Sequence, residues 1–260
     1  MELSRRSFLA TGTLGAVLNP SALREPQPTP AAVPASFPSH DPMLAKEMVA
    51  VSHGNVARVR ELLSGRPALA KAVWDWGYGD WETALGAASH VANKEIAQLL
   101  LSAGAPPTIF SAAMLGQLAV VQAMIAAAPG LQRVKGPHGI PLLTHAKLGG
   151  ASEVVKYLES LGDANPLYVN EPLSDADRAA ILGTYVYGAG PTETLTVLVN
   201  NRNALMIQRE GAVERNLFHL GGRAFHPSGA EHVRIRFAAG EQAATVRIED
   251  GGLAVVATRR

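Results

Sequence analysis

The stretch "TALGAASHVANKEIAQLLLSAGAP", residues 83–106, contains a complete pair of helices. Alanines line the inner face of a first short helix, a tight turn follows, and a second helix carries a leucine-rich stripe and ends before Gly104. A glycine just past a helix adopts the left-handed conformation that ends the helix without a Cβ penalty. Such a pair cannot bury its apolar faces alone, so the stretch predicts a fold in which several pairs stack.

Three further stretches have the same layout, at residues 45–64, 108–127 and 141–165. These units resemble ankyrin repeats. The matching residues are Thr83, Leu85, Ala88, Leu99, Leu100, Gly104 and Ala105 in one repeat, and Gly139, Leu143, Ala146, Gly150, Val154, Val155, Leu158 and Gly162 in another. The resemblance implies a stack of about four degenerate repeats over residues 43–165. A helical bundle of another kind is the alternative.

The segment "WDWGYGDW", residues 74–81, holds all 3 tryptophans of the chain. Gly77 and Gly79 would weaken a helix or a strand, so the segment is predicted to be a loop. It falls where ankyrin repeats project a β-hairpin, and "VKGPHG", residues 134–139, falls at the corresponding place before the last repeat. Exposed aromatic rings are common binding anchors. The candidate protein-binding residues are therefore Trp74, Trp76, Tyr78, Trp81 and His138. The alternative is that the rings cover the adjacent repeat.

The chain changes character at Leu173, after a strap over residues 166–172. Residues 173–260 alternate apolar and polar side chains in six or seven short stretches, which predicts an antiparallel meander closing into a barrel-like domain. The expected fold class is therefore α+β, a helical repeat stack followed by a small β domain. The second part resembles the domain appended to exported serine β-lactamase-like hydrolases, through Leu173, Ser174, Gly183, Thr184, Tyr185, Phe225, Val233 and Phe237. That resemblance implies an accessory module without chemistry.

The beginning of the chain resembles a twin-arginine export signal. Arg5 and Arg6 precede a short apolar run that is too short to span a bilayer as a stable helix. We assign residues 1–24 to this signal and the proline-rich residues 25–42 to a linker. The expected location is the periplasm or another site outside the cytoplasm, without stable membrane insertion.

Composition excludes several classes of protein. The chain has 260 residues, a formal net charge of +1 and no cysteine. The balanced charge argues against nucleic-acid binding. The absence of cysteine excludes disulfides, cysteine–zinc sites and thiol chemistry.

No catalytic motif stands out in the sequence. The chain has no Ser-x-x-Lys, the nucleophile motif of a β-lactamase-like hydrolase. His219, His226 and His232 lie near one another along the chain, but a turn after His226 argues against convergence on zinc. His145, on an inner helix, is expected to be a hydrogen-bonded core histidine. We therefore expect no metal, no cofactor and no enzymatic activity.

The expected function is that of a periplasmic module that binds another protein. Two alternatives remain open. The chain could be an accessory subunit or a hydrolase-related enzyme with a site between its domains, or it could bind a small ligand inside the β domain. A convergent polar cluster in a deep pocket would favour the enzyme, and a wide apolar lumen would favour the ligand binder.

Overall fold

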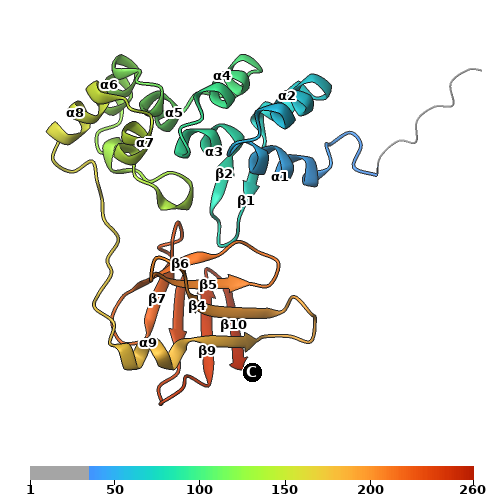
Figure 1. Ribbon diagram of the computed structural model, residues 1–260, viewed down its shortest axis with the longest axis vertical. Coiled ribbons are helices and arrows are strands. Elements are labelled where there is room, and N and C mark those ends of the chain that lie inside the picture. Colours follow the sequence, from blue (N-terminus) through green and yellow to red (C-terminus); the bar gives the residue numbers. More distant parts are fainter. Residues whose placement is uncertain (1–34) are drawn as a thin grey trace, which may run out of the picture. The chain divides into compact units, whose positions relative to one another are not determined.

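The computed structural model describes residues 35–260, and residues 40–260 form one compact unit. Four pairs of helices come first in the described part of the chain (Figure 1). The pairs are α1 (Pro42–Val51) with α2 (Val56–Gly65), α3 (Ala84–His90) with α4 (Lys94–Ser102), α5 (Ile109–Met114) with α6 (Leu118–Ala127), and α7 (Leu142–Leu148) with α8 (Ser152–Ser160).

Local chemistry fixes the ends of these helices. The side chains of Asn55, Thr83 and Asn93 accept hydrogen bonds from backbone N–H groups in the first turns of α2, α3 and α4. Each bond satisfies a donor that has no partner inside the helix. Gly104 and Gly162, just beyond α4 and α8, have φ values of 92° and 80°, the left-handed conformation expected of them.

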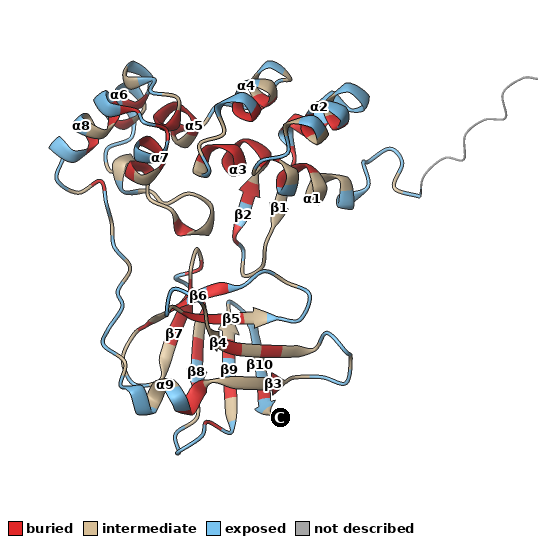
Figure 2. Ribbon diagram, in the orientation of Figure 1, coloured by how far each residue is buried: buried red, intermediate tan, exposed pale blue. Residues whose placement is uncertain are grey.

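The first helices of the pairs pack against one another, α1 on α3, α3 on α5 and α5 on α7. Figure 2 shows α3 buried along nearly its whole length, and its residues Ala84 to Ser89 are all buried. Small side chains allow this close approach. At Gly149, after α7, a Cβ atom would lie 2.1 Å from the carbonyl oxygen of Met114 in α5, so only glycine fits there.

The tryptophan-rich segment forms a β-hairpin. Strand β1 (Val73–Asp75) pairs antiparallel with β2 (Trp81–Thr83). Gly77, Tyr78 and Gly79 join the strands with φ values of 108°, 59° and 73°. The strand therefore ends at Asp75, and the alternation of side chains expected to place Trp74, Trp76 and Tyr78 on one face does not extend to Tyr78.

The ankyrin assignment is corrected by the structure. Residues 134–139 form no second hairpin, only a single bridge between Lys135 and Pro141 around the 3₁₀ turn η3 (Pro137–Gly139). The α-helices of the described residues range from 6 to 10 residues in length, and the segments between the pairs differ. The four units are therefore helix pairs of unequal length and not regular copies of one repeat.

The C-terminal part is a closed antiparallel barrel, so the α+β class is confirmed. Helix α9 (Asp175–Ile181) precedes it, with the Ser174 hydroxyl capping its first turn. Each strand pairs with the next along the chain, and the last pairs with the first. The strands are β3 (Gly183–Val186), β4 (Thr194–Val199), β5 (Leu205–Arg209), β6 (Arg215–His219), β7 (Ala224–Pro227), β8 (Arg234–Phe237), β9 (Thr245–Asp250) and β10 (Leu253–Arg259).

The barrel interior is filled with side chains. The core residues Tyr185, Phe225, Ile235 and Val246 are 0% exposed. The Tyr185 hydroxyl donates to the carbonyl oxygen of Ile181, 2.8 Å away, which ties α9 to the barrel. The barrel has one or two more strands than the sequence predicted, because the short strand β7 contains Pro227 and reads as a turn.

Two other expectations concern the N-terminus and membranes. The export signal predicted at residues 1–24 lies outside the described residues, so export stays a prediction. Within residues 35–260, none of the helices combines the length and the apolar character needed to cross a membrane.

Candidate metal centre

Four side chains from three separate parts of the helical region converge on one point. His53, Glu82, His90 and His138 each bring one nitrogen or oxygen atom to within 4.8 Å of the others. Glu82 is completely buried, and the three histidines are partly buried. Imidazole nitrogens and a carboxylate oxygen are ligands that suit zinc and related divalent ions.

His53 and His90 occupy equivalent positions on neighbouring helices. His53 follows the end of α1 and His90 ends α3, and each comes directly after a buried serine. The hydroxyls of Ser52 and Ser89 donate to the carbonyl oxygens of Met48 and Leu85, at 2.7 and 2.6 Å. Because α1 packs on α3, the two imidazoles meet, with 3.0 Å between their Nε2 atoms.

Glu82 enters the cluster from the hairpin. In β2 the side chains of Trp81, Glu82 and Thr83 are exposed, buried and half-buried in turn, so the pleat directs Glu82 inward. Trp76 Nε1 donates to Glu82 Oε2 at 2.7 Å. The buried Oε1 has no hydrogen-bond donor in suitable geometry among the described residues. A buried carboxylate oxygen without a donor is costly unless a cation balances it.

His138 is held in place by Asp80. The backbone N–H of His138, a residue with a φ of 59°, donates to Asp80 Oδ1 at 2.8 Å, and its ring Nδ1 lies 2.7 Å from Asp80 Oδ2. Asp80 is 3% exposed and also forms an ion pair with Arg215, at the start of β6. These contacts orient His138 Nε2 toward Glu82 Oε1, 3.4 Å away.

The protonation of the cluster reflects these contacts. Burial would raise the pKa of Glu82, but the His138 and His90 imidazoles lower it to about 2. Burial would lower the pKa of His138, but Asp80 and Glu82 raise it to about 9. Burial would likewise raise the pKa of Asp80, yet the hydrogen bonds from His138 and the charge of Arg215 hold it below its usual value. In the metal-free protein both carboxylates are therefore ionised near neutral pH.

The spacing of the four atoms fits a tetrahedral ion. His90 Nε2 lies 2.9 Å from Glu82 Oε1 and 3.0 Å from His53 Nε2, and the His138–Glu82 and His53–Glu82 distances are 3.4 and 3.6 Å. Zinc bonds of about 2.0–2.1 Å in tetrahedral geometry place the ligand atoms roughly 3.3 Å apart. The four distances lie on either side of this separation, and all four ligand atoms lie within 4.8 Å of one another.

The Nδ1 atoms of His53 and His138 contact protein groups outside the cluster, and their Nε2 atoms face the cluster. His53 Nδ1 lies 3.0 Å from the Ala50 carbonyl oxygen, and His138 Nδ1 faces the Asp80 carboxylate. The Ala50 carbonyl oxygen can only accept, so His53 Nδ1 carries the hydrogen and the neutral His53 ring presents its Nε2 lone pair. His138 Nδ1 lies between the Asp80 carboxylate and an Arg215 nitrogen at 3.0 Å, and its raised pKa means that metal binding at Nε2 must displace a proton. A histidine that donates to a carbonyl or a carboxylate and binds an ion through its other nitrogen is typical of zinc sites.

The structure distributes the five predicted protein-binding residues over different environments. Trp74 and Trp76 pack against the helical core, Tyr78 packs against the barrel core, and Trp81 is 63% exposed. His138 belongs to the metal-ligand cluster. Capture of another protein by these residues stays a prediction.

Other residues considered in the sequence lie elsewhere. His219, His226 and His232 have separate partners, the carbonyl oxygens of Glu171 and Gly222, the carbonyl oxygen of Pro227, and the carboxylate of Asp250. His145 is 0% exposed, and neither ring nitrogen has a hydrogen-bond partner in the described residues, which corrects the expectation of a hydrogen-bonded histidine.

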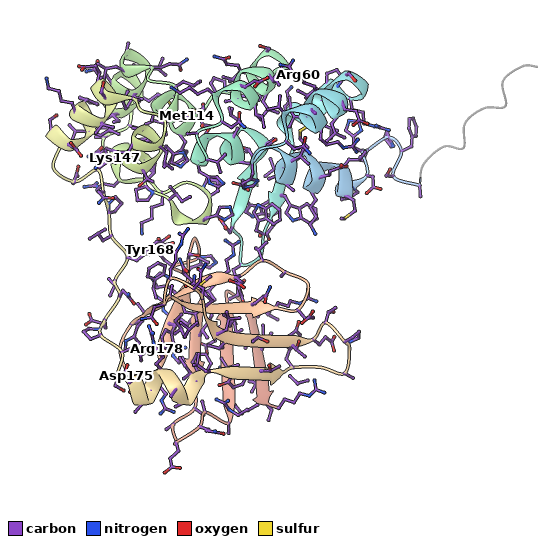
Figure 3. All side chains as sticks on the ribbon, in the orientation of Figure 1. Arg60, Met114, Lys147, Tyr168, Asp175 and Arg178 are labelled. Atoms are coloured by element: carbon purple, nitrogen blue, oxygen red, sulfur yellow. The ribbon has the colours of Figure 1, made fainter. Side chains whose placement is uncertain are left out.

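The strap over residues 166–172 contacts the barrel at several residues. Asn170 Oδ1 accepts from the His219 N–H at 3.0 Å, and the Glu171 N–H donates to the His219 carbonyl oxygen at 2.9 Å. Tyr168, labelled in Figure 3, stacks on Phe218 with 4.2 Å between ring centroids. Its hydroxyl accepts from the Gly229 N–H at 3.1 Å. Leu167 and Val169, on either side, are 81% and 58% exposed. Tyr168 therefore provides the apolar contact of the strap, and its neighbours face solvent.

The sequence contained one signal for the metal ligands. The dipeptide Ser-His occurs at residues 52–53 and again at 89–90, at the same place in two successive helix pairs. Stacked pairs bring such positions side by side. Glu82 and His138 carried no comparable signal, because their approach depends on the hairpin and on the turn before α7.

Comparison with known proteins gives no family. No family model matches the chain, and no curated protein matches it. Among solved structures the chain is similar to one described as "Crystal structure of SurE", with 24% identity over 45% of this chain and 27% of that one, and a TM-score of 0.26. A likeness of this size assigns neither a fold nor an activity to the chain.

These findings correct two expectations. No family model supports the resemblance to ankyrin repeats or to the domain of exported β-lactamase-like hydrolases. The expectation of a chain without enzymatic activity is dropped with them, because it rested on the absence of catalytic motifs in the sequence, and a convergent polar site would favour an enzyme. The structure contains such a site.

Proposed function

We propose that the protein is a metalloprotein that binds one zinc-class divalent ion through His53, Glu82, His90 and His138. The observation that carries the proposal is the convergence of three imidazole Nε2 atoms on the buried Glu82 carboxylate, those of His90 and His138 near Oε1 and that of His53 near Oε2. Three neutral histidines and one carboxylate would hold a divalent cation with a net charge of +1. Asp80 then supplies a further negative charge next to His138.

Metal titration tests this proposal. Full-length protein stripped with a chelator should bind one zinc ion per chain, measured by calorimetry and by elemental analysis after gel filtration. The paired change His53→Ala with His90→Ala removes two ligands from the ends of two helices and should abolish stoichiometric binding. His232→Ala is the matched control, because this histidine is exposed, lies in the barrel and pairs with Asp250.

Zinc should also stabilise the fold. A ligand that binds only the folded state contributes about 2.7 kcal/mol at a free concentration 100 times its dissociation constant. The melting temperature should therefore rise with zinc in the wild type and in His232→Ala, and should not rise in the His53→Ala, His90→Ala pair. Equal zinc binding by the pair and the wild type would contradict the proposed centre.

A second proposal keeps the hairpin as a site of protein capture, and Trp81 is the residue that favours it. Its ring is 63% exposed, whereas Trp74 and Trp76 pack on the helical core. Trp81→Ala should leave the free energy of unfolding within about 0.5 kcal/mol of the wild type, as expected of an exposed side chain. Pull-down from the native extract with wild type and with Trp81→Ala would show a partner lost only in the variant, and identical captured proteins would refute this role.

A further inference from the structure

A cavity of about 780 Å³ lies between the hairpin and the barrel. The hairpin side supplies the rings of Trp74, Trp76 and Tyr78, and Tyr187, which follows β3, adds a fourth aromatic ring. Four barrel strands supply aliphatic side chains, Leu195 in β4, Ile207 in β5, Ile248 in β9 and Val255 in β10. A volume of this size and a mainly apolar, aromatic wall are typical of sites for small molecules.

Arg215, at the start of β6, adds a buried guanidinium to this wall. The residue is 4% exposed, and its Nη1 forms the ion pair with Asp80. The other two nitrogens, Nε and Nη2, are buried and have no hydrogen-bond acceptor in suitable geometry among the described residues. These two atoms form one edge of the guanidinium, the fork that binds both oxygens of a carboxylate. A carboxylate in the cavity would supply the acceptors that Arg215 lacks.

The charges around the cavity also favour an anion. The lining holds three basic and two acidic side chains, Lys46, Arg209, Arg215, Asp75 and Asp250. Both acids already have a partner, because Asp75 Oδ1 accepts from the Gly77 N–H at 2.8 Å and Asp250 Oδ1 lies 3.3 Å from His232 Nε2. A cationic ligand would meet the excess of basic groups, and an apolar ligand would leave the two Arg215 nitrogens without acceptors.

We propose that this cavity binds a small carboxylate with an aromatic body. The carboxylate accepts from Nε and Nη2 of Arg215, and the aromatic body packs among the rings of the hairpin and the aliphatic side chains of the barrel. None of the four proposed metal ligands is among the residues that line this cavity. The inference therefore goes beyond the proposed function and does not depend on it.

Calorimetric titration of the full-length protein with 2-naphthoate tests the proposal, and 2-naphthamide is the uncharged probe of the same shape. We expect one naphthoate to bind per chain and the amide to bind at least about tenfold more weakly, because hydrogen bonds to an ionised acceptor are roughly twice as strong as neutral ones. Arg215→Lys keeps a positive charge for Asp80 but lacks the fork. It should weaken naphthoate binding at least about tenfold.

Two variants of β10 test whether the probe occupies the cavity, and they do so without altering Arg215. Val255 lines the cavity, whereas Val256 is 51% exposed and points to the opposite face of the strand. Val255→Trp fills the space and should lower the affinity for naphthoate at least about tenfold, and Val256→Trp should keep the wild-type affinity. Melting curves establish that each variant is folded.

Three results would overturn the inference. They are absence of naphthoate binding by the wild type, equal affinities for the acid and the amide, and equal affinities in folded Val255→Trp and the wild type. Zinc binding by the same protein is measured separately, so each of these results would leave the proposed metal centre standing.

Discussion

Within residues 35–260, His145 is a buried histidine without a hydrogen-bond partner in good geometry. It is 0% exposed and packs against Phe110, with 4.9 Å between the ring centroids. Burial, assisted by the nearby His90, lowers its pKa to about 4. The ring is therefore neutral at pH 7, and neither nitrogen has a hydrogen-bond partner in good geometry among the described residues, which costs about 1–3 kcal/mol for an unsatisfied polar group.

Replacing His145 should therefore stabilise the protein. We expect His145→Leu, a change to an apolar side chain of similar volume, to leave the free energy of unfolding at pH 7 unchanged or to raise it by about 1–3 kcal/mol. Urea unfolding at pH 7 measures this. A loss of more than about 2 kcal/mol would show that the imidazole makes a contact that its surroundings do not reveal.

The same variant should change the acid stability. The unfolded histidine has a pKa near 6.5 and the folded one a pKa of about 4, so between these values the unfolded chain binds more protons. Stability due to this residue is complete above pH 6.5 and is lost as the pH falls toward 4, by roughly 3 kcal/mol at 1.36 kcal/mol per pKa unit. Unfolding curves at pH 4.5, 5.5 and 7 should show a shallower acid decline in His145→Leu than in the wild type.

In the proposed metal centre, Asp80 supports the ion through His138. Its carboxylate accepts from His138 Nδ1 and so fixes the nitrogen that faces Glu82. We expect Asp80→Asn to weaken zinc binding about 10- to 100-fold, the usual effect of removing such a supporting carboxylate. Competition with a chromogenic chelator measures the affinity. Asp250→Asn, which changes the partner of His232, is the control, and equal affinities in the two variants would remove Asp80 from the centre.

At the scale of elements, the hairpin connects the cluster to the helical core. Its register places Trp74 opposite Glu82 and Asp75 opposite Trp81. This pairing sends Trp81 outward and Glu82 inward, because successive side chains of a strand point to opposite faces. A shift of one residue would expose Glu82 and remove the carboxylate from the cluster.

Trp76 supports this arrangement through a single hydrogen bond. Trp76→Phe keeps most of the ring and removes the Nε1 donor to Glu82 Oε2. Since hydrogen bonds to charged groups contribute about 1.5–3 kcal/mol, we expect a loss of that size in the free energy of unfolding of the metal-free protein. Trp74→Phe, in the strand β1 that precedes Trp76, is the matched control. Chemical denaturation of both variants measures the loss in the free energy of unfolding. A larger loss in Trp76→Phe than in Trp74→Phe would show that the Trp76 indole N–H contributes to stability beyond the packing of its ring.

At the scale of the whole molecule, one buried ion pair joins the hairpin to the barrel. Asp80 and Arg215, 135 residues apart in the chain, are 3% and 4% exposed. Tyr78 adds an apolar contact with the barrel core. Because of these contacts, we expect residues 40–260 to unfold as one cooperative unit, although the helices and the barrel have separate cores.

Removing the arginine should uncouple the two parts. Arg215→Met leaves Asp80 buried without this partner, a change that typically destabilises by about 3–5 kcal/mol. Calorimetry should show one cooperative transition for the wild type and two for the variant. Arg209→Met, in which the lost arginine is exposed and bonded to the Tyr187 hydroxyl, should keep one transition. A single unshifted transition in Arg215→Met would contradict this coupling.

The sequence by itself determined the local structure. Helix ends follow from Asn55, Thr83 and Gly104, whose side chain or lack of one acts within a few residues. The strand at residues 194–199 follows from an alternation that the barrel preserves. These features depend on interactions between neighbours in the chain, and such interactions can be read from short stretches.

Only the tertiary structure decided the metal centre and the closure of the barrel. In the sequence, 84 residues lie between His53 and His138. Their approach depends on how α1, α3, the hairpin and the turn before α7 pack together. Strand β7 was missed in the sequence because Pro227 predicts a turn, and its position is fixed by pairing with β6 and β8. The physical reason is the same in each case: a site made by contacts between distant segments has no local pattern, and packing alone sets its distances.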